Sequence, residues 1–183
     1  KATVTINFSG TYDFDDIMSR MELSALCDIL SVRYTESIRE EQGGTYGVAV
    51  YPMQVHYPYE NYRVQIFFDC DPANAEKLKT IAYEEIEKIK RQGPLLKDLN
   101  GVKENLLKTY DEKQIQNGYW LGLLKSIDMD HTEVSYHSKY QDYVGKLTVE
   151  GLKTAANEFF GGNVAEVVLM PANMEDNTAN PVK

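Results

Sequence analysis

The stretch TYGVAVYPMQVHYPYENYRVQIFFD, residues 45–69, holds two runs rich in β-branched and aromatic residues on either side of HYPYEN. Such runs favour strands, and the proline and asparagine between them favour a turn. The pattern predicts a β-hairpin with strands at about 46–55 and 62–69. Pro52 lies inside the first run, which predicts an edge strand or a bulge there, because proline cannot donate a hydrogen bond to a neighbouring strand.

The chain before the hairpin contains one further strand and one long helix. Apolar and polar residues alternate over residues 2–9, which predicts a half-buried strand that ends at Gly10. Apolar residues then recur at helical spacing, so we expect a long helix from about Asp15 to about Glu41. Asp13 or Asp15 is available as its N-cap.

The chain after the hairpin is mainly helical. A helix begins at Asp71-Pro72, where a capping carboxylate precedes a proline, and Gly93-Pro94 ends it. A second helical run continues less regularly through Gly118 towards Ser126. Two more helices are predicted at about 132–145 and 149–160, with Thr148 as the N-cap of the latter. The run VAEVVLM, residues 164–170, predicts a buried final strand.

This order of elements decides the fold class. A hairpin inside the chain and helices grouped after it do not fit the regular strand–helix alternation of a doubly wound fold. We therefore predict a two-layer α+β fold, with helices packed on one face of a mainly antiparallel sheet. The prediction is a single domain over residues 1–183 with a polar tail at 172–183. Because the chain starts without methionine, we expect a processed product or a piece of something longer, and its compartment is unknown.

Composition excludes several classes of partner. Lys plus Arg number 19 and Asp plus Glu 28, giving a formal net charge of -9, and basic residues form no stripe interleaved with aromatics. Nucleic acid is therefore not an expected partner. No run approaches the roughly 18 apolar residues of a membrane span, so none is predicted. Cys27 and Cys70 are expected to be reduced core residues.

The sequence predicts no metal ligands in this domain. The three histidines are His56, His131 and His137, and the last two are six residues apart, which does not place them on one face of a helix. Neither His-x-x-Glu-His nor His-Glu-x-x-His occurs. Helix capping and solubility explain the carboxylate clusters, which are Asp13/Asp15/Asp16, Glu84/Glu85/Glu87 and Asp128/Asp130.

The segment SIREEQGGTYGVAV, residues 37–50, joins the long helix to the hairpin. Its glycines do not predict a phosphate loop, because a phosphate cradle needs a strand followed by a helix, and here the order is reversed. Arg39 and Tyr46 are the candidate functional pair. A structural role explains them equally well, since helix C-termini favour arginine and strands favour tyrosine.

The order of elements and the segment IREEQGGTYGV resemble the C-terminal domains of pitrilysin-type zinc metallopeptidases. That family contains insulin-degrading enzyme and the mitochondrial processing peptidases, and the run GPLLKDLNGVKENLL also resembles one of its recurring segments. In its catalytic members a His-x-x-Glu-His helix of the first domain holds the zinc. The corresponding helix here reads LSALCDILSVRY. The resemblance therefore implies a domain with no cofactor of its own, whose partner is a zinc-bearing domain or subunit.

The same resemblance implies roles for individual residues. Arg39 becomes a donor to a carbonyl of a peptide substrate, and Tyr46 a hydroxyl donor to the same region or to the developing oxyanion. Gly43 and Gly44 become the substrate-binding turn that lets a peptide approach. The expected function is the substrate-binding, non-metal domain of a zinc metalloendopeptidase, inactive when isolated. The alternatives are a non-catalytic scaffold of the same fold or, if the resemblance is set aside, a soluble α+β interaction domain of unknown partner.

Overall fold

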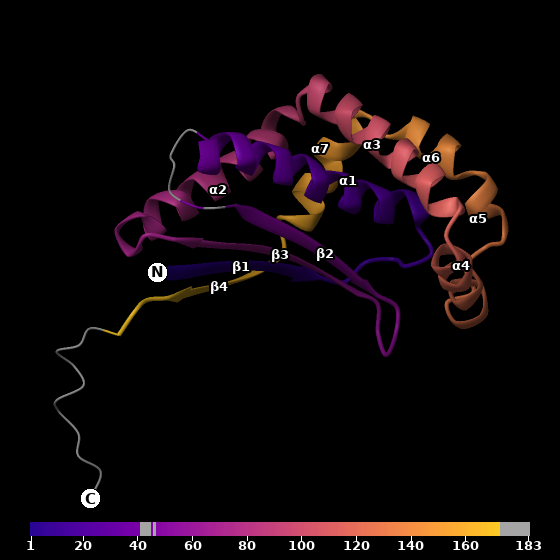
Figure 1. Cartoon of the computed structure of the whole chain (residues 1–183), viewed down its shortest axis with the longest axis horizontal. Helices are drawn as coiled ribbons and strands as arrows, with labels where there is room; N and C mark the ends of the chain where they lie inside the picture. Colours follow the sequence, from indigo (N-terminus) through magenta and orange to yellow (C-terminus); the bar gives the residue numbers. More distant parts are fainter. Residues whose placement is uncertain (41–44, 46, 173–183) are drawn as a thin grey trace, which may run out of the picture.

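The sheet has four antiparallel strands. The structure, a computed structural model, describes residues 1–40, 45 and 47–172. The strands are β1 (Ala2–Gly10), β2 (Val48–Val55), β3 (Asn61–Cys70) and β4 (Asn163–Leu169), and their order in the sheet is β2-β3-β1-β4. Within the described part of the chain, the helices form a second layer on one face of this sheet (Figure 1). The predicted α+β fold with helices on one face is confirmed.

The helical layer follows the predicted order with different boundaries. Its elements are α1 (Ile17–Tyr34), η1 (Thr35–Glu40), η2 (Pro72–Asn74), α2 (Ala75–Gln92), α3 (Leu96–Gln114), α4 (Asn117–Met129), α5 (Ser135–Ser138), α6 (Tyr140–Lys146) and α7 (Val149–Phe159). The single long helix expected to reach Glu41 is an α-helix that continues as the π-helical segment η1. The run expected to continue towards Ser126 is two helices, and the region 132–145 contains two short helices in place of one.

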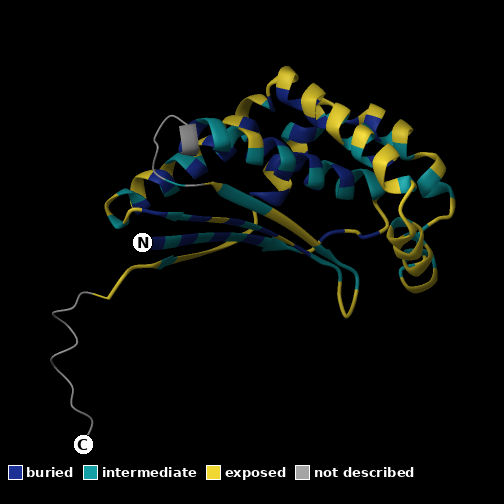
Figure 2. Cartoon of the chain, viewed as in Figure 1, coloured by how far each residue is buried: buried dark blue, intermediate teal, exposed yellow. Residues whose placement is uncertain are grey.

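The core lies between the sheet and the helices. Alternate residues of β1 and β3 point towards the helices and are buried, which the register explains because Ile6 pairs with Ile66 and Val4 with Phe68. The opposing side is the aliphatic face of α1, and α2 and α7 complete the layer. Figure 2 shows the buried residues concentrated at this boundary. Cys27 is buried in this core and is a free thiol, as is Cys70.

The hairpin matches its prediction closely. β2 and β3 pair antiparallel from Val48↔Phe68 to Val55↔Asn61, and β2 is an edge strand of the sheet. The edge position explains how Pro52 is accommodated inside β2, since one side of an edge strand has no partner strand.

The last strand differs from its prediction. We expected VAEVVLM to be buried, but β4 lies at the other edge of the sheet and most of it is exposed. Val167 is 48% exposed and Leu169 61%. Val167 pairs with Thr5 on the face that points away from the helices, whereas Val168 packs against the core. A short apolar run cannot distinguish a buried strand from an edge strand, because that depends on what covers its two faces.

One of the predicted helix caps, the N-cap of α1, is wrong. Asp16 is the N-cap of α1, not Asp13 or Asp15, and its carboxylate accepts a hydrogen bond from the Ser19 amide at 3.0 Å. The carboxylate of Asp13 instead accepts from the Asp15 amide, within the turn before the helix. Adjacent aspartates offer the same capping chemistry, so the local chain path selects among them.

The other predicted caps are confirmed. The Asp71 carboxylate accepts from the amide of Ala73, and the Thr148 hydroxyl accepts from the amide of Gly151. α2 ends before Gly93, which has a positive φ of 76° and donates its N–H to the Ile89 carbonyl. None of the helices in the described chain is long and apolar enough to cross a membrane.

Candidate functional site

The candidate site is the junction where α1 passes into η1 and the chain turns to β2. Arg39 belongs to η1, and the structure describes its backbone and not its side chain. Gly43, Gly44 and Tyr46 lie outside the described residues. η1 is in contact with β2, so the C-terminal end of the helix lies beside the hairpin.

The junction is built on a π-helical turn. η1 directly continues α1, and π-helical segments of this kind occur frequently at functional sites. The hydroxyl of Thr35 donates to the Ser31 carbonyl, and that of Ser37 to the Arg33 carbonyl, both at 2.9 Å. Ile38 is completely buried. These contacts fix the backbone of η1 up to the position next to Arg39.

A buried tyrosine attaches this end of α1 to α2. The Tyr34 side chain is fully buried, and its hydroxyl donates to the Ala82 carbonyl at 3.0 Å. Burial raises the pKa of this phenol well above its ordinary value, so it stays protonated and keeps its hydrogen bond across the physiological range.

A network of ion pairs connects η1 with α1 and α2. Arg33 of α1 binds Glu85 of α2 (Nε–Oε2 3.0 Å) and Glu36 of η1 (Nη1–Oε2 2.6 Å), and Lys88 binds the other oxygen of Glu85 at 2.7 Å. The Glu85 side chain is only 3% exposed. Burial by itself raises the pKa of this carboxyl, but the hydrogen bonds from Lys88 and Arg33 outweigh it, and the pKa lies below its usual value. One guanidinium therefore joins three helical elements at the junction.

The burial of Glu85 corrects a prediction. The sequence assigned the Glu84/Glu85/Glu87 cluster to capping and solubility, yet Glu85 is in the core. Its spacing carries a signal for this, because Leu78, Ala82, Glu85 and Ile89 follow one helical stripe, and the other three are buried apolar residues. A carboxylate on an apolar stripe needs a charged partner, and Arg33 was the residue that sequence reasoning missed.

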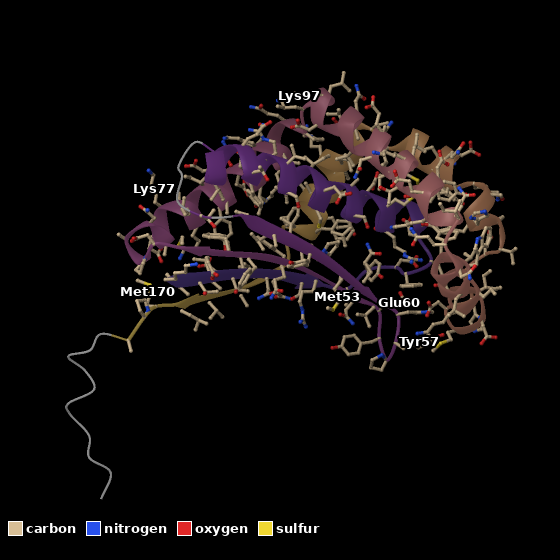
Figure 3. All side chains as sticks on the ribbon, viewed as in Figure 1. Met53, Tyr57, Glu60, Lys77, Lys97 and Met170 are labelled. Carbon is tan, nitrogen blue, oxygen red and sulfur yellow. The ribbon has the colours of Figure 1, made fainter. Side chains whose placement is uncertain are left out.

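A second acidic group lies near the same network. Asp98 of α3 is 7% exposed, and its Oδ2 makes no hydrogen bond with any part of the described chain. Lys97, at the start of α3, pairs with Glu36 at 3.6 Å and with the other Asp98 oxygen at 4.0 Å. Figure 3 shows Lys97 on the side of the helical layer that faces away from the sheet. The lysine adds positive charge next to Glu36 of η1. Its side chain is 64% exposed and both pairs are long, so they contribute little to stability.

The residues of α1 do not fit a zinc ion. Leu23, Leu26, Ile29 and Leu30 fill its inner face and are completely buried, so the helix that would carry ligands packs its apolar side into the core. Burial raises the pKa of the Cys27 thiol, which therefore stays protonated and is a poor ligand. Across the described ranges, no three His, Cys, Asp or Glu residues are grouped so that they could hold a metal.

The family model for the peptidase M16 inactive domain matches residues 2–106 of this chain. The chain belongs to this family. The non-zinc domain of a pitrilysin-type zinc protease expected from the segment IREEQGGTYGV is thereby confirmed at the level of the family.

Individual relatives agree with the family assignment. This M16 inactive domain is 31% identical over 58 residues to the zinc protease PQQL-like of Arabidopsis thaliana; the match covers 32% of this chain and 6% of the relative. Its fold is similar to that of the periplasmic protease PqqL from Escherichia coli (TM-score 0.76, 22% identity), over 93% of this chain and 19% of PqqL. A protease from Helicobacter pylori has a TM-score of 0.80 at 18% identity, over 93% of this chain and 41% of that protein. The chain thus spans less than half the length of these proteins.

Proposed function

We propose that this M16 inactive domain binds peptide substrates for a zinc metallopeptidase and completes an active site whose zinc lies on another domain. In this proposal Arg39 donates to a carbonyl of the substrate. Tyr46 donates its hydroxyl to the oxygen on which negative charge develops. Gly43 and Gly44 form the turn that the peptide approaches.

The observation that carries this proposal is the character of α1. In the catalytic domains that the resemblance implies, the corresponding helix carries the zinc ligands. Here that helix presents buried aliphatic residues instead, so we assign this domain a role other than holding the metal. The anchoring of η1 supports a role in positioning. Arg33 ties η1 to α2 through Glu85, and a donor acts on a transition state only if its backbone is held in place.

The chemistry assigned to the pair is ordinary for peptide hydrolysis. Attack on a peptide carbonyl leaves negative charge on its oxygen, and preorganised donors aimed at that oxygen lower the barrier. A guanidinium is always charged and holds a carbonyl or carboxylate in a fixed geometry. A phenol is neutral at pH 7 and donates without adding net charge.

The test is peptide hydrolysis by the longest natural form of the protein, with zinc present and after chelation. We compare wild type with Arg39→Ala and Tyr46→Phe, and confirm the folding of each variant by circular dichroism. Tyr46→Phe is expected to lower kcat by about 10²-fold or more, the size typical of a lost oxyanion donor. Two exposed residues supply matched controls, Arg91→Ala on α2 and Tyr51→Phe on β2, and both are expected to leave kcat unchanged.

The opposite results support the scaffold alternative. If the folded Arg39→Ala and Tyr46→Phe variants cut peptides at the wild-type rate, the pair does not act in the reaction. If the longest natural form hydrolyses no peptide with zinc present, the domain serves assembly, and the junction is a hinge between helix and strand.

A further inference from the structure

A tyrosine-lined hollow lies at the other end of the helical layer. Its volume is about 360 Å³, and it opens between α1, α3 and the α4–α6 segment. Figure 1 shows α4, α5 and α6 grouped at the end of the molecule opposite the C-terminal end of α1. We call it the tyrosine pocket, and the residues that define it are Tyr110, Tyr119, Tyr136, Tyr140, Asp28 and Lys113. Because the tyrosine pocket lies at the α4–α6 end and η1 follows the opposite end of α1, the pocket is distinct from the η1 junction.

The four tyrosine rings form a continuous wall. Tyr110 and Tyr140 are stacked, with centroids 4.5 Å apart and an interplanar angle of 13°. Tyr136 meets Tyr140 edge to face at 6.1 Å, and Tyr119 meets Tyr110 in the same way at 6.3 Å. Each ring touches the next, so the pocket presents π surface contributed by α3, α4, α5 and α6.

Two of these tyrosines are held by a single histidine. The Tyr110 hydroxyl donates to the backbone carbonyl of His137 at 2.6 Å, and the Tyr119 hydroxyl lies 2.7 Å from His137 Nδ1. The Trp120 indole N–H donates to the Gln114 carbonyl and fixes the start of α4. Part of the wall is thus preorganised by hydrogen bonds.

Other polar groups of the pocket have no partner. In the described chain, the Asp28 carboxylate and the hydroxyls of Tyr136 and Tyr140 make no hydrogen bond and no ion pair. Asp28 is half-buried in the middle of α1, and burial raises the pKa of its carboxyl. Lys113 also lines the pocket and lowers that pKa by its charge, but among the ion pairs of the described residues none joins Lys113 to Asp28. A carboxylate in this position is stabilised by a cation that enters the pocket.

The space leading to the pocket suits a peptide. A neighbouring hollow of about 380 Å³ shares Tyr119 and Tyr136, and its lining includes Gly118 and Gly122 of α4 and Arg20 of α1. A Cβ added at either glycine meets nothing within 4 Å, so the α4 backbone leaves open space on this side. Among the described residues of α4, none is buried. An extended segment has room beside α4 while one of its side chains enters the tyrosine pocket.

We propose that the tyrosine pocket binds the basic side chain of a peptide, an arginine or a lysine, with Asp28 as its counter-charge and the stacked tyrosines as its aromatic wall. Aromatic faces attract guanidinium and ammonium groups, and a carboxylate at the end of an aromatic pocket selects the positive charge. The fold already makes such contacts nearby, because Arg20 lies 3.9 Å from the centroid of Phe14, and Lys146 lies 5.3 Å from that of Tyr143. The pocket volume lies at the lower end of the roughly 300–1,000 Å³ found for ligand sites. The inference rests on the proposed function only in that the ligand is a peptide.

The test is a calorimetric titration of the 183-residue chain with capped tripeptides that differ in their central residue. The arginine and lysine peptides are expected to bind, and the peptide with citrulline, which has nearly the shape of arginine without its charge, at least about tenfold more weakly. Asp28→Asn is expected to reduce the affinity for the arginine peptide to the level of the citrulline peptide. Asp142→Asn removes the same charge from an exposed position of α6 and is expected to change nothing.

Several results overturn the proposal. Equal affinities for the arginine and citrulline peptides would show that binding does not depend on the positive charge of the ligand. This comparison uses only the wild-type chain, so it does not depend on the folding of a variant. Binding that is unchanged in Asp28→Asn, or absent at millimolar peptide, removes the site. The proposal expects Lys113→Met to bind the arginine peptide equally well or more tightly, because a cation that competes for Asp28 has been removed. Weaker binding of the arginine peptide by this variant would show that the pocket holds an anion.

The binding test is independent of the hydrolysis test. Normal hydrolysis by Arg39→Ala and Tyr46→Phe removes the proposed role of those residues and leaves the titration unaffected. Loss of hydrolysis in those variants together with no binding of the arginine peptide leaves the proposed function standing and removes the tyrosine pocket as a site.

Discussion

Replacing Arg33 tests the ion-pair network that anchors the candidate site. Arg33→Met keeps the length of the side chain and removes the guanidinium that binds the Glu85 carboxylate at 3.0 Å. Breaking a buried pair by removing one partner costs about 3–5 kcal/mol when the remaining charge is left alone. Here Lys88 still binds the second oxygen at 2.7 Å, so we expect the smaller loss of about 2–3 kcal/mol in the free energy of unfolding. That corresponds to a fall in Tm of roughly 5–10 °C for a domain of this size.

The measurement is urea unfolding at pH 7, monitored by circular dichroism. All variants are fitted with the same dependence of the free energy of unfolding on urea concentration. The control is Glu87→Gln on α2, the helix that carries Glu85. This change breaks the more exposed pair with Lys90 and is expected to cost less than about 0.5 kcal/mol. Because Arg33 also binds Glu36, amide hydrogen exchange in η1 is expected to accelerate more in Arg33→Met than in the control. If Arg33→Met loses no more free energy of unfolding than the control, the reasoning that the buried Glu85 carboxylate depends on Arg33 is refuted.

The same pair predicts a dependence on pH. The folded-state pKa of Glu85 lies below its usual value near 4.5, so the pair stabilises the fold above that value and loses its contribution as the pH falls through the folded pKa. The difference in unfolding free energy between wild type and Arg33→Met is therefore expected to be constant from pH 8 to about pH 5 and to narrow in more acid solution. A difference that stays the same down to pH 3 would contradict the electrostatic origin of the effect.

Three further changes probe the fold by the same unfolding assay. Ile66→Ala leaves a cavity in the completely buried centre of β3 and is expected to cost about 3–4 kcal/mol; a loss below 1 kcal/mol would mean that the core collapses around the gap. Gly93→Ala forces a side chain into a positive φ of 76° with its Cβ 2.6 Å from Val149 Cγ1, and is expected to cost about 2 kcal/mol or more. Tyr62→Phe removes the buried hydrogen bond to the Phe159 carbonyl at 3.0 Å, and about 1–2 kcal/mol is expected to be lost; no change would show that water replaces the hydroxyl.

The local parts of the fold could be predicted because their signals are short-range. The hairpin around HYPYEN was predicted from strand-forming residues and a turn, and both strands lie within a few residues of the predicted bounds. Asp71 and Thr148 were predicted as caps because a cap depends only on the two or three amides that follow it. Pro52 placed its strand at an edge because a missing donor is a property of the residue itself.

The errors concern residues whose environment is decided by distant segments. VAEVVLM is apolar, and whether it is buried depends on which helices cover its two faces, which the run does not encode. Glu85 shares a helical stripe with apolar residues, but its partner Arg33 is 52 positions away in the sequence. The aspartate that caps α1 was one of three neighbours with the same chemistry, and the path of the turn selected Asp16.

The sequence alone determined the two-layer fold, the absence of zinc-ligand motifs and the family resemblance, because periodicity, turn residues and the segment IREEQGGTYGV are all local patterns. Only the tertiary structure decided which charges are buried and which tyrosines share a pocket. The Arg33–Glu85 pair joins α1 to α2, and the tyrosine pocket combines Asp28 of α1 with rings from four later helices. Burial and ion pairing depend on distances between segments that are far apart in the chain, and packing of the helices on the sheet sets those distances.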